Sequence, residues 1–211
     1  MDRLRVLTGV RLASVAVVVV AIVTQAVVLA NADAFDPTRF FAFFTILSNL
    51  IGVTAFTWLL VRGDRQRLHG VDLLRGAAVV YLTVTFFVVI FLLSGVDVQL
   101  QLVWVDVVLH KIFPIVVVLD WILDPPLTRM SWRDGLLWLT FPLVWTGFTL
   151  TRGAIDGWYP YPFLDPTNGG YGTVAVIVIA VTIGFALIAA ATIAVGNRAR
   201  ESSPSSADGV A

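Results

Sequence analysis

The sequence contains no cysteine, and this absence excludes several kinds of site at once. Disulfides, iron–sulfur clusters and thiolate metal sites all need cysteine sulfur. Histidine is scarce as well, because the chain has only His69 and His110, and His69 lies in a charged segment. A bis-histidine haem or a His-rich metal centre within a membrane cannot be built from this set. We therefore expect no metal site and no cofactor.

Charge is the second scarcity. Only 13% of the 211 residues are charged, 58% are hydrophobic, and the formal net charge is zero. The mean hydropathy of +0.90 lies far above ordinary globular usage. A neutral chain gives no electrostatic reason to expect a nucleic-acid partner, so none is predicted. The composition instead predicts an integral membrane protein whose surroundings are membrane lipids.

Long apolar segments are plentiful. A helix needs about 20 apolar residues to cross the hydrocarbon layer, and the alternating pattern of a membrane β-barrel is absent. We expect an all-α, six-helix bundle over residues 1–197, followed by a disordered tail over 198–211. The first segment exceeds the usual apolar core of a signal peptide, so we expect it to be retained as a helix. The predicted spans are 12–30, 40–61, 73–93, 102–123, 136–150 and 173–195.

The basic residues predict the orientation of the spans. Arginine is concentrated in the segments on one side, which the positive-inside rule assigns to the cytoplasm. Both termini are then cytoplasmic, and the protein is a multi-pass protein of the plasma membrane. The cytoplasmic set is Arg3, Arg5, Arg11, Arg62, Arg65, Arg67, Arg75, Arg129, Arg133, Arg198 and Arg200, whereas the outer segments hold only Arg39 and Arg152 beside Asp33, Asp36, Asp97, Asp156 and Asp165.

A polar stripe interrupts the second span. In "FFAFFTILSNLIG", the side chains of Thr45, Ser48, Asn49 and Gly52 share one helix face, because residues three and four apart are neighbours on a helix. Small and hydroxyl-bearing residues at this spacing commonly mediate helix packing. Packing and chemistry are therefore both open explanations for the stripe.

The fourth span, "LVWVDVVLHKIFPIVVVLDWIL", contains four ionisable residues at positions where a charge costs on the order of 3 kcal/mol. At about 100° per residue, Asp106, His110 and Asp120 fall within one arc of about 80°, while Lys111 points elsewhere. Asp120 lies near the cytoplasmic end, where pairing with arginines is expected. Pro114 can kink the helix and free a backbone carbonyl just inward of His110, which would suit a widened cavity.

Thr45 and His110 lie at similar depths in the outer half of the membrane, about 9 and 12 Å inward from their respective helix ends. A hydroxyl becomes a good nucleophile when a neutral imidazole accepts its proton. Asp106 could hold the imidazole in one tautomer. These residues predict a Thr–His–Asp relay, with Ser48 or Asn49 as donors to an oxyanion.

Three segments carry a resemblance to a known family. "FFTILSN", "LHKIFPIVVVLDWILDPP" and "YPYPFLD" resemble the bacterial, chiefly actinobacterial, six-helix proteins related to the androgen-induced membrane proteins of animals. The similarity covers nearly the whole chain apart from the tail. It implies an integral-membrane threonine hydrolase that cleaves fatty acid esters of hydroxy fatty acids. The catalytic roles would fall on Thr45 and His110.

Two other functions remain open. A proton- or ion-coupled transporter could use Asp106, His110, Lys111 and Asp120 as its path, although no inverted repeat is visible. A chromophore-binding protein could use Lys111, the single lysine, for a Schiff base.

For the esterase, we expect an elongated apolar cavity whose polar point is Thr45 and His110, with a fatty acyl ester as substrate. Its roof would be the aromatic outer loop 158–163. The candidate pocket residues are Lys111, Phe41, Phe44, Phe113, Trp145, Tyr159 and Tyr161, with Phe86, Phe87, Phe91, Trp104 and Phe148 as further wall residues.

Overall fold

The structure of the protein, a computed structural model, describes residues 2–62, 68–93 and 102–202. Over these ranges the chain is helical and contains no strand, so the all-α prediction is confirmed. Arg65, Arg67 and Asp97 lie outside the described residues. The elements are α1 (Asp2–Asn31), α2 (Pro37–Phe40), α3 (Phe44–Arg62), α4 (His69–Phe91), α5 (Val103–Val107), η2 (Val108–Ile112), α6 (Phe113–Leu123), α7 (Trp132–Asp156), η3 (Pro162–Leu164), η4 (Pro166–Asn168) and α8 (Gly170–Glu201).

Four of the described helices are long and apolar enough to cross a membrane, namely Arg3–Asn31, Phe44–Arg62, His69–Phe91 and Gly170–Glu201. They match the first, second, third and sixth predicted spans. The predicted fourth span is helical along its length but is divided by a π-helical turn into α5, η2 and α6. The predicted fifth span lies within α7, where several threonines and polar ends lower the hydropathy. The length and composition of these four helices indicate a membrane protein.

Helix boundaries differ from the prediction mainly at the ends. The first helix begins at Asp2, ten residues before the apolar segment itself, because its first turns are polar but still helical. The last helix continues to Glu201, so residues 198–201 are helical and not part of a disordered tail. Residues 203–211 of the predicted tail lie outside the described residues.

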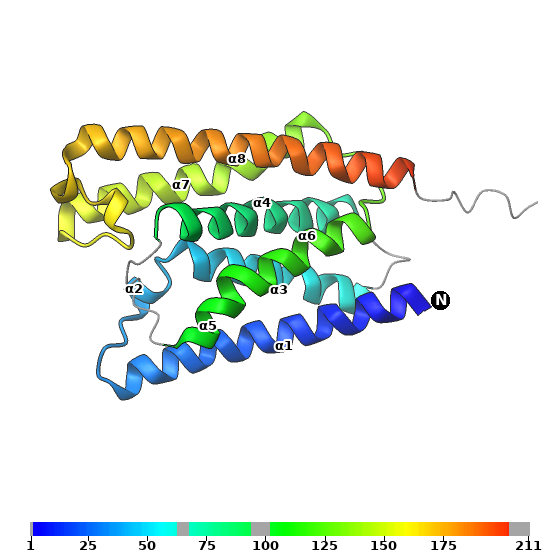
Figure 1. Ribbon diagram of the computed structural model, residues 1–211, viewed down its shortest axis with the longest axis horizontal. Coiled ribbons are helices and arrows are strands. Elements are labelled where there is room, and N and C mark those ends of the chain that lie inside the picture. The colour runs from blue at the N-terminus through cyan, green and yellow to red at the C-terminus, as the bar shows by residue number, and fades with distance from the viewer. Residues whose placement is uncertain (1, 63–67, 94–101, 203–211) are drawn as a thin grey trace, which may run out of the picture.

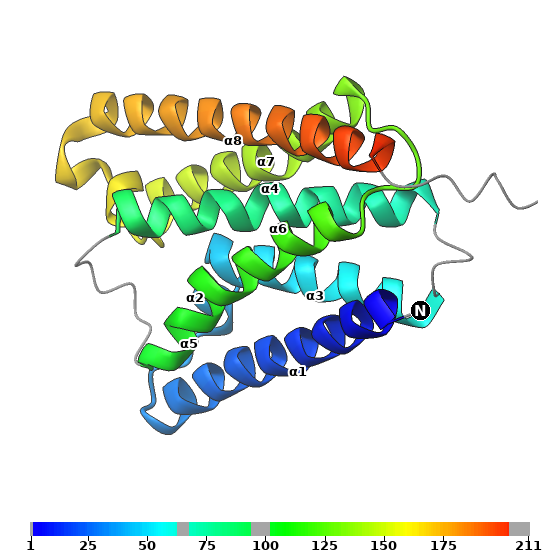
Figure 2. The same ribbon diagram turned by 45° about the vertical axis from the view of Figure 1, so that its right-hand side comes forward.

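Helix α4 occupies the centre of the molecule. It packs against α3, α6, α7 and α8, and its middle turns are almost continuously buried. Helices α1 and α8 lie on opposite outer sides, and Figures 1 and 2 show this from two directions. Their apolar windows are only 22% and 17% buried, against 56% in α4. A helix that is apolar all round and exposed on its outer side is suited to contact with lipid.

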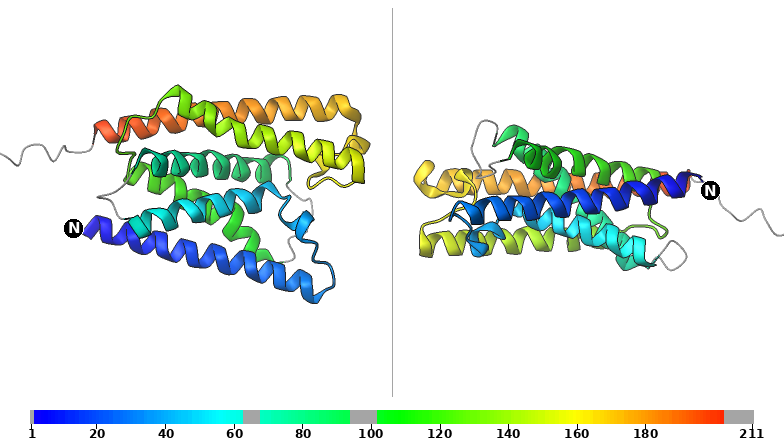
Figure 3. Two further views of the ribbon diagram at one scale, coloured as in Figure 1. Left: turned by 180° about the vertical axis from the view of Figure 1, so that it is seen from behind. Right: turned by 90° about the horizontal axis from the view of Figure 1, so that it is seen from below.

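Different elements lie at the two ends of the helical body. The start of α1 and the end of α8 lie at the same end, on opposite sides of the molecule, as Figures 1 and 3 show. Helix α2 and the short helix η3 lie at the opposite end, where the chain passes from α7 to α8.

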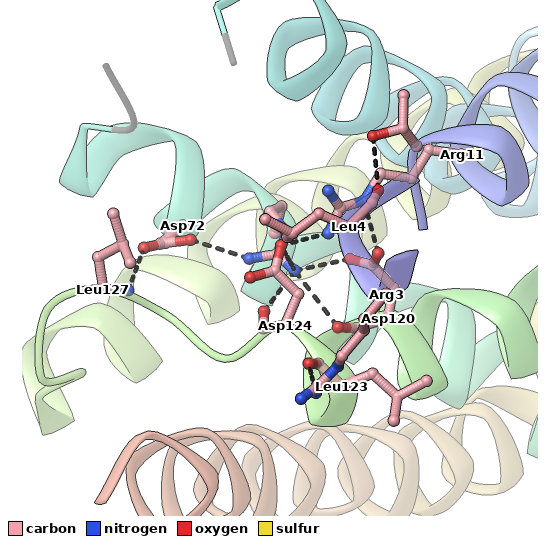
Figure 4. A network of polar contacts seen from close by, with 10 residues as sticks. Arg3, Leu4, Arg11, Asp72, Asp120, Leu123, Asp124 and Leu127 are labelled. Atoms are coloured by element: carbon pink, nitrogen blue, oxygen red, sulfur yellow. Dashed lines mark hydrogen bonds and ion pairs between the residues drawn. The ribbon is translucent and has the colours of Figure 1, made fainter. Parts of the chain in front are cut away.

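A buried ionic cluster ties three helices together at the end that holds the start of α1 (Figure 4). Asp120 of α6 accepts from Arg11 of α1 at 2.6 Å and from Arg75 of α4 at 2.6 Å. Asp72 binds Arg75 at 3.0 Å, and Asp124 also pairs with Arg11. The expectation that Asp120 pairs with arginines is confirmed.

Candidate functional site

Thr45 and His110 lie in contact near the opposite end of the bundle. Thr45 is the second residue of α3, and His110 lies in the π-helical turn η2. Oγ1 of Thr45 is 3.1 Å from Nε2 of His110, and the two side chains are almost completely buried. This distance is within hydrogen-bond reach, which is the first geometric requirement for a nucleophile and its base.

The π-helical turn explains how α3 and η2 meet. The N–H of Phe113 donates to the carbonyl of Val108, five residues back, instead of to Leu109. Pro114 has no N–H, so it cannot satisfy the Leu109 carbonyl either. Nδ2 of Asn49 donates to that carbonyl at 3.2 Å. The break in the helix thus creates an acceptor, and a polar side chain of α3 binds it.

Asp106 lies on the far side of the imidazole from Thr45. Its Oδ1 is 2.8 Å from Nδ1 of His110, and its backbone oxygen is 3.2 Å from the same nitrogen. A carboxylate and a carbonyl can only accept, so the proton of a neutral His110 belongs on Nδ1. Nε2 can then accept a hydrogen bond from the hydroxyl of Thr45.

Tyr161, in the segment between α7 and α8, also reaches Thr45. Its hydroxyl oxygen is 3.4 Å from Oγ1 of Thr45 and 3.4 Å from the backbone nitrogen of Thr45. The ring is stacked on Phe163, with centroids 5.3 Å apart and planes at 3°. The sequence predicted an aromatic roof over residues 158–163. It could not predict that the Tyr161 hydroxyl contacts α3, because an irregular segment has no periodic pattern.

The side-chain donors of Ser48 and Asn49 do not bind the Thr45 hydroxyl. Oγ of Ser48 donates to the carbonyl of Thr45 at 3.1 Å, and Nδ2 of Asn49 donates to the same carbonyl at 2.8 Å. Ser48 also lies 3.4 Å from the hydroxyl of Thr85. Their donors are thus directed at backbone carbonyls, so the geometry gives no support to these two residues as oxyanion donors. They fix the start of α3 instead.

An apolar cavity opens beside Thr45, between α4, α7, α8 and the segment that joins α7 to α8. Its empty volume is about 690 Å³ when the space at its open side is included. Leu143 belongs to the lining and is also half exposed, so the cavity opens at the surface of α7. The lining residues are Phe44, Thr45, Val84, Thr85, Val88, Val89, Leu93, Leu139, Pro142, Leu143, Trp145, Thr146, Tyr161, Phe163, Leu164, Ile177, Val178, Val181, Thr182 and Phe185.

Most of the predicted wall residues do not line this cavity. Phe44, Trp145 and Tyr161 do, and the loop residues Phe163 and Leu164 join them. The prediction selected residues by aromatic type, whereas the lining is set by which face of α4 and α8 is turned inward. The predicted residues that lie elsewhere are Lys111, Phe41, Phe86, Phe87, Phe91, Trp104, Phe113, Phe148 and Tyr159.

Three of these residues have other surroundings in the structure. Phe113 is buried against α3, where the Cβ of any residue replacing Gly52 would lie 2.7 Å from its ring. Tyr159 packs onto the backbone of α7 at Gly153. Lys111 is exposed on the surface of η2, away from the cavity.

The ionisable residues of the fourth predicted span do not form one group. Asp106 contacts His110, whereas Asp120 lies ten residues further along and pairs with Arg11 and Arg75. Ten helical residues correspond to about 15 Å. Among the residues that the structure describes, no three His, Asp or Glu side chains are grouped so that they could hold a metal ion.

Comparisons with known proteins give no match. No protein-family model matches the chain, and neither a curated protein nor a solved structure does so. The arrangement of Thr45, His110 and Asp106 beside the cavity is therefore the observation from which a function is inferred.

Proposed function

We propose that the protein is an integral-membrane esterase that hydrolyses fatty acyl esters, with Thr45 as nucleophile and His110 as base. One observation carries the proposal: a Thr–His–Asp series with contacts of 3.1 and 2.8 Å ends at the wall of an apolar cavity. Thr45 lines that cavity and His110 lies behind it. The order of groups is that of a nucleophile, a general base and an orienting carboxylate.

In the first step, Oγ1 of Thr45 attacks the ester carbonyl while its proton passes to Nε2 of His110. A tetrahedral intermediate forms, and the imidazolium is stabilised by Asp106 at its Nδ1. The carbon–oxygen bond to the alcohol then breaks. The leaving alkoxide takes the proton from Nε2, and the acyl group stays on Thr45.

In the second step, water takes the place of the alcohol. His110 accepts a proton from the water as its oxygen attacks the acyl carbon. The bond to Oγ1 breaks, the proton returns from His110 to Thr45, and the fatty acid leaves. The reaction consumes one water and needs no oxidant, reductant or metal.

The cavity supports an acyl substrate over an ion. Its walls are chiefly aliphatic and aromatic side chains, most of them from α4, α7 and α8, and most of its polar members carry hydroxyl groups. Burial of each methylene group is worth about 0.8 kcal/mol relative to water, although a substrate already dissolved in lipid gains less. The resemblance to threonine hydrolases of fatty acid esters of hydroxy fatty acids, carried by "FFTILSN" and "LHKIFPIVVVLDWILDPP", supports this substrate class.

The proposal includes a membrane arrangement with six crossings in the plasma membrane. Helices α1, α3, α4 and α8 are four of them, and α5–η2–α6 and α7 supply the other two. The end with Arg3, Arg11 and Arg75 is then cytoplasmic, and both ends of the chain lie on that side. The Thr45 site faces the outer half of the membrane.

The transporter reading has less support. A path through Asp120 would require that carboxylate to be free to exchange protons, but it is held by two buried arginines. A Schiff base on Lys111 would require the lysine to face a pocket, and Lys111 is exposed on η2 instead.

Labelling with a fluorophosphonate probe tests the esterase. The purified protein in detergent should be labelled, and Thr45→Ala and His110→Ala should abolish labelling while both variants unfold at temperatures near that of the parent protein. The matched controls are Thr54→Ala, which changes an exposed threonine of the same helix, and His69→Ala, which changes the other histidine. Both controls should be labelled normally. Undiminished labelling of Thr45→Ala would remove the mechanism.

A further inference from the structure

The start of α3 presents backbone donors beside the nucleophile. Thr45 is the second residue of a 19-residue helix, and the first N–H groups of a helix have no acceptor within it. The acceptor of the Thr45 N–H is the hydroxyl oxygen of Tyr161, at the long distance of 3.4 Å. Such donors are suited to bind a negatively charged oxygen, and the helix dipole favours it.

The ring of Tyr161 is held in place by aromatic neighbours. The side chain is 5% exposed. Its ring lies 5.7 Å from that of Phe43 and 6.0 Å from that of Trp145, in addition to the stack on Phe163. Because aromatic contacts on three sides fix the ring, the hydroxyl is positioned before any substrate arrives, which is the condition for effective electrostatic stabilisation.

The phenol remains a donor at alkaline pH. Burial raises the pKa of Tyr161 above its usual value, although hydrogen bonds from Thr45 and from the backbone of Phe44 act in the opposite direction. The hydroxyl therefore keeps its proton where an exposed tyrosine would begin to lose it.

The cavity lining shows which of the polar groups near Thr45 a substrate could contact. Thr45 and Tyr161 line the cavity, whereas His110 does not. A carbonyl that enters from the cavity therefore meets the Tyr161 hydroxyl, and the Thr45 N–H lies 3.4 Å from that hydroxyl. Two donors that lie 3.4 Å apart can both reach one oxygen, at the usual distance of about 2.9 Å from each.

We propose that the hydroxyl of Tyr161 and the backbone N–H of Thr45 together form the oxyanion site of the esterase. This inference rests on the proposed function, because it assigns the donors for the intermediate formed on Thr45. Ser48 and Asn49 are not assigned this role, because their donors are directed at backbone carbonyls or at Thr85. In the free protein the Tyr161 hydroxyl interacts with Oγ1 of Thr45, and in the reaction it donates to the oxygen of the substrate.

The variant Tyr161→Phe tests the assignment, since it removes one oxygen and retains the stacked ring. We expect kcat for a long-chain p-nitrophenyl ester to fall by about 10²–10³-fold, as for other losses of one oxyanion donor. Binding of an acyl trifluoromethyl ketone, which forms an oxyanion on the nucleophile, should weaken by a comparable factor. Binding of an alkyl ether with the same chain length, which forms none, should not change.

Tyr81→Phe is the matched control. It also removes a buried tyrosine hydroxyl, which donates to the carbonyl of Trp138 at 2.9 Å outside the cavity. We expect kcat and both affinities to stay at the parent values. The control separates a missing oxyanion donor from a general loss of a buried hydrogen bond.

The outcomes separate the two proposals. If Tyr161→Phe retains the parent kcat and ketone affinity while Thr45→Ala is inactive, the oxyanion assignment is wrong and the esterase stands. Equal weakening of ketone and ether would make Tyr161 a packing residue and would also overturn the assignment. If the parent protein hydrolyses no ester, or Thr45→Ala remains active, the proposed function fails and this inference fails with it.

Replacement of Tyr161 by a trifluorotyrosine gives a test that does not remove the hydroxyl. Fluorination lowers the phenol pKa, so the donor proton is lost at lower pH. We expect the alkaline loss of activity to move to lower pH relative to the parent protein. Identical pH profiles would contradict a role for the phenolic proton.

Discussion

Oγ1 of Thr45 lies 3.1 Å from Nε2 of His110, although 65 positions separate the two residues in the chain. The contact joins the first turn of one helix to a π-helical turn of another, and Asn49 fastens the two by donating to the Leu109 carbonyl. Functional residues are often found at such turns, because the local widening re-aims a side chain.

The carboxylate of Asp106 should be needed for rapid ester hydrolysis. Replacement of Asp106 by Asn removes the negative charge that faces Nδ1 of His110. The imidazolium formed during attack loses that stabilisation, so kcat for ester hydrolysis should fall by about 10²–10⁴-fold. Steady-state assays on a p-nitrophenyl ester measure it. Asp165→Asn, between η3 and η4, should retain parent activity. An Asp106→Asn variant as active as the parent would exclude the carboxylate from the relay.

Acyl-chain selectivity should depend on the face of α8 that lines the cavity. Val181→Phe adds volume inside the cavity, whereas Ile183→Phe adds it on the same helix at a position that is 55% exposed. We expect Val181→Phe to lower kcat/KM for long-chain esters relative to short ones by about tenfold or more, since one misfit methylene is worth about 1–3 kcal/mol. The ratio for Ile183→Phe should match the parent. Similar ratios for both variants would place the acyl chain elsewhere.

The buried ionic cluster should matter for stability and not for chemistry. Asp120→Asn leaves two buried arginines without their shared carboxylate. Loss of one partner in a buried pair costs on the order of 3–5 kcal/mol. Denaturant unfolding in detergent should show this decrease, while Asp36→Asn, at an exposed pair, should unfold almost like the parent. Unchanged stability together with loss of a proton flux in liposomes would instead favour a transporter.

Glycine at position 52 should be required for packing. A Cβ there would lie 2.7 Å from the ring of Phe113, the first residue of α6, which is buried against α3. Gly52→Ala should therefore destabilise the protein by about 1–3 kcal/mol through overpacking. Thermal unfolding provides the measurement. Gly147→Ala, where no atom lies within 4 Å of the added carbon, should have little effect.

Helical periodicity and depth were enough to place Thr45 and His110 at the same level of the bundle. Both estimates use only the rise per residue and the outer ends of the helices. The position of Asp120 near the arginine-rich end of the helices was enough to predict its pairing with arginines. These inferences succeed because they depend on regular helix geometry and on the cost of an unpaired buried charge.

Helical periodicity and charge could not predict the π-helical turn or the cavity. A phase of 100° per residue assumes an uninterrupted α-helix, so it cannot include the five-residue register at Val108–Ile112. The cavity depends on how α4, α7 and α8 are rotated against one another, and Val178 and Val181 are indistinguishable in type from lipid-facing valines. The Tyr161 hydroxyl is placed by an irregular loop, for which sequence has no period.

Mass spectrometry of the covalent adduct tests the central claim most directly. The parent protein is treated with a fluorophosphonate, digested, and the modified residue is located by fragmentation of the peptide that contains residues 40–52. The esterase predicts a single modification on Oγ1 of Thr45, with Ser48 three residues later unmodified and no adduct on this peptide in His110→Ala. An adduct on Ser48, or a peptide that stays unmodified while the protein is labelled elsewhere, would contradict Thr45 as the nucleophile.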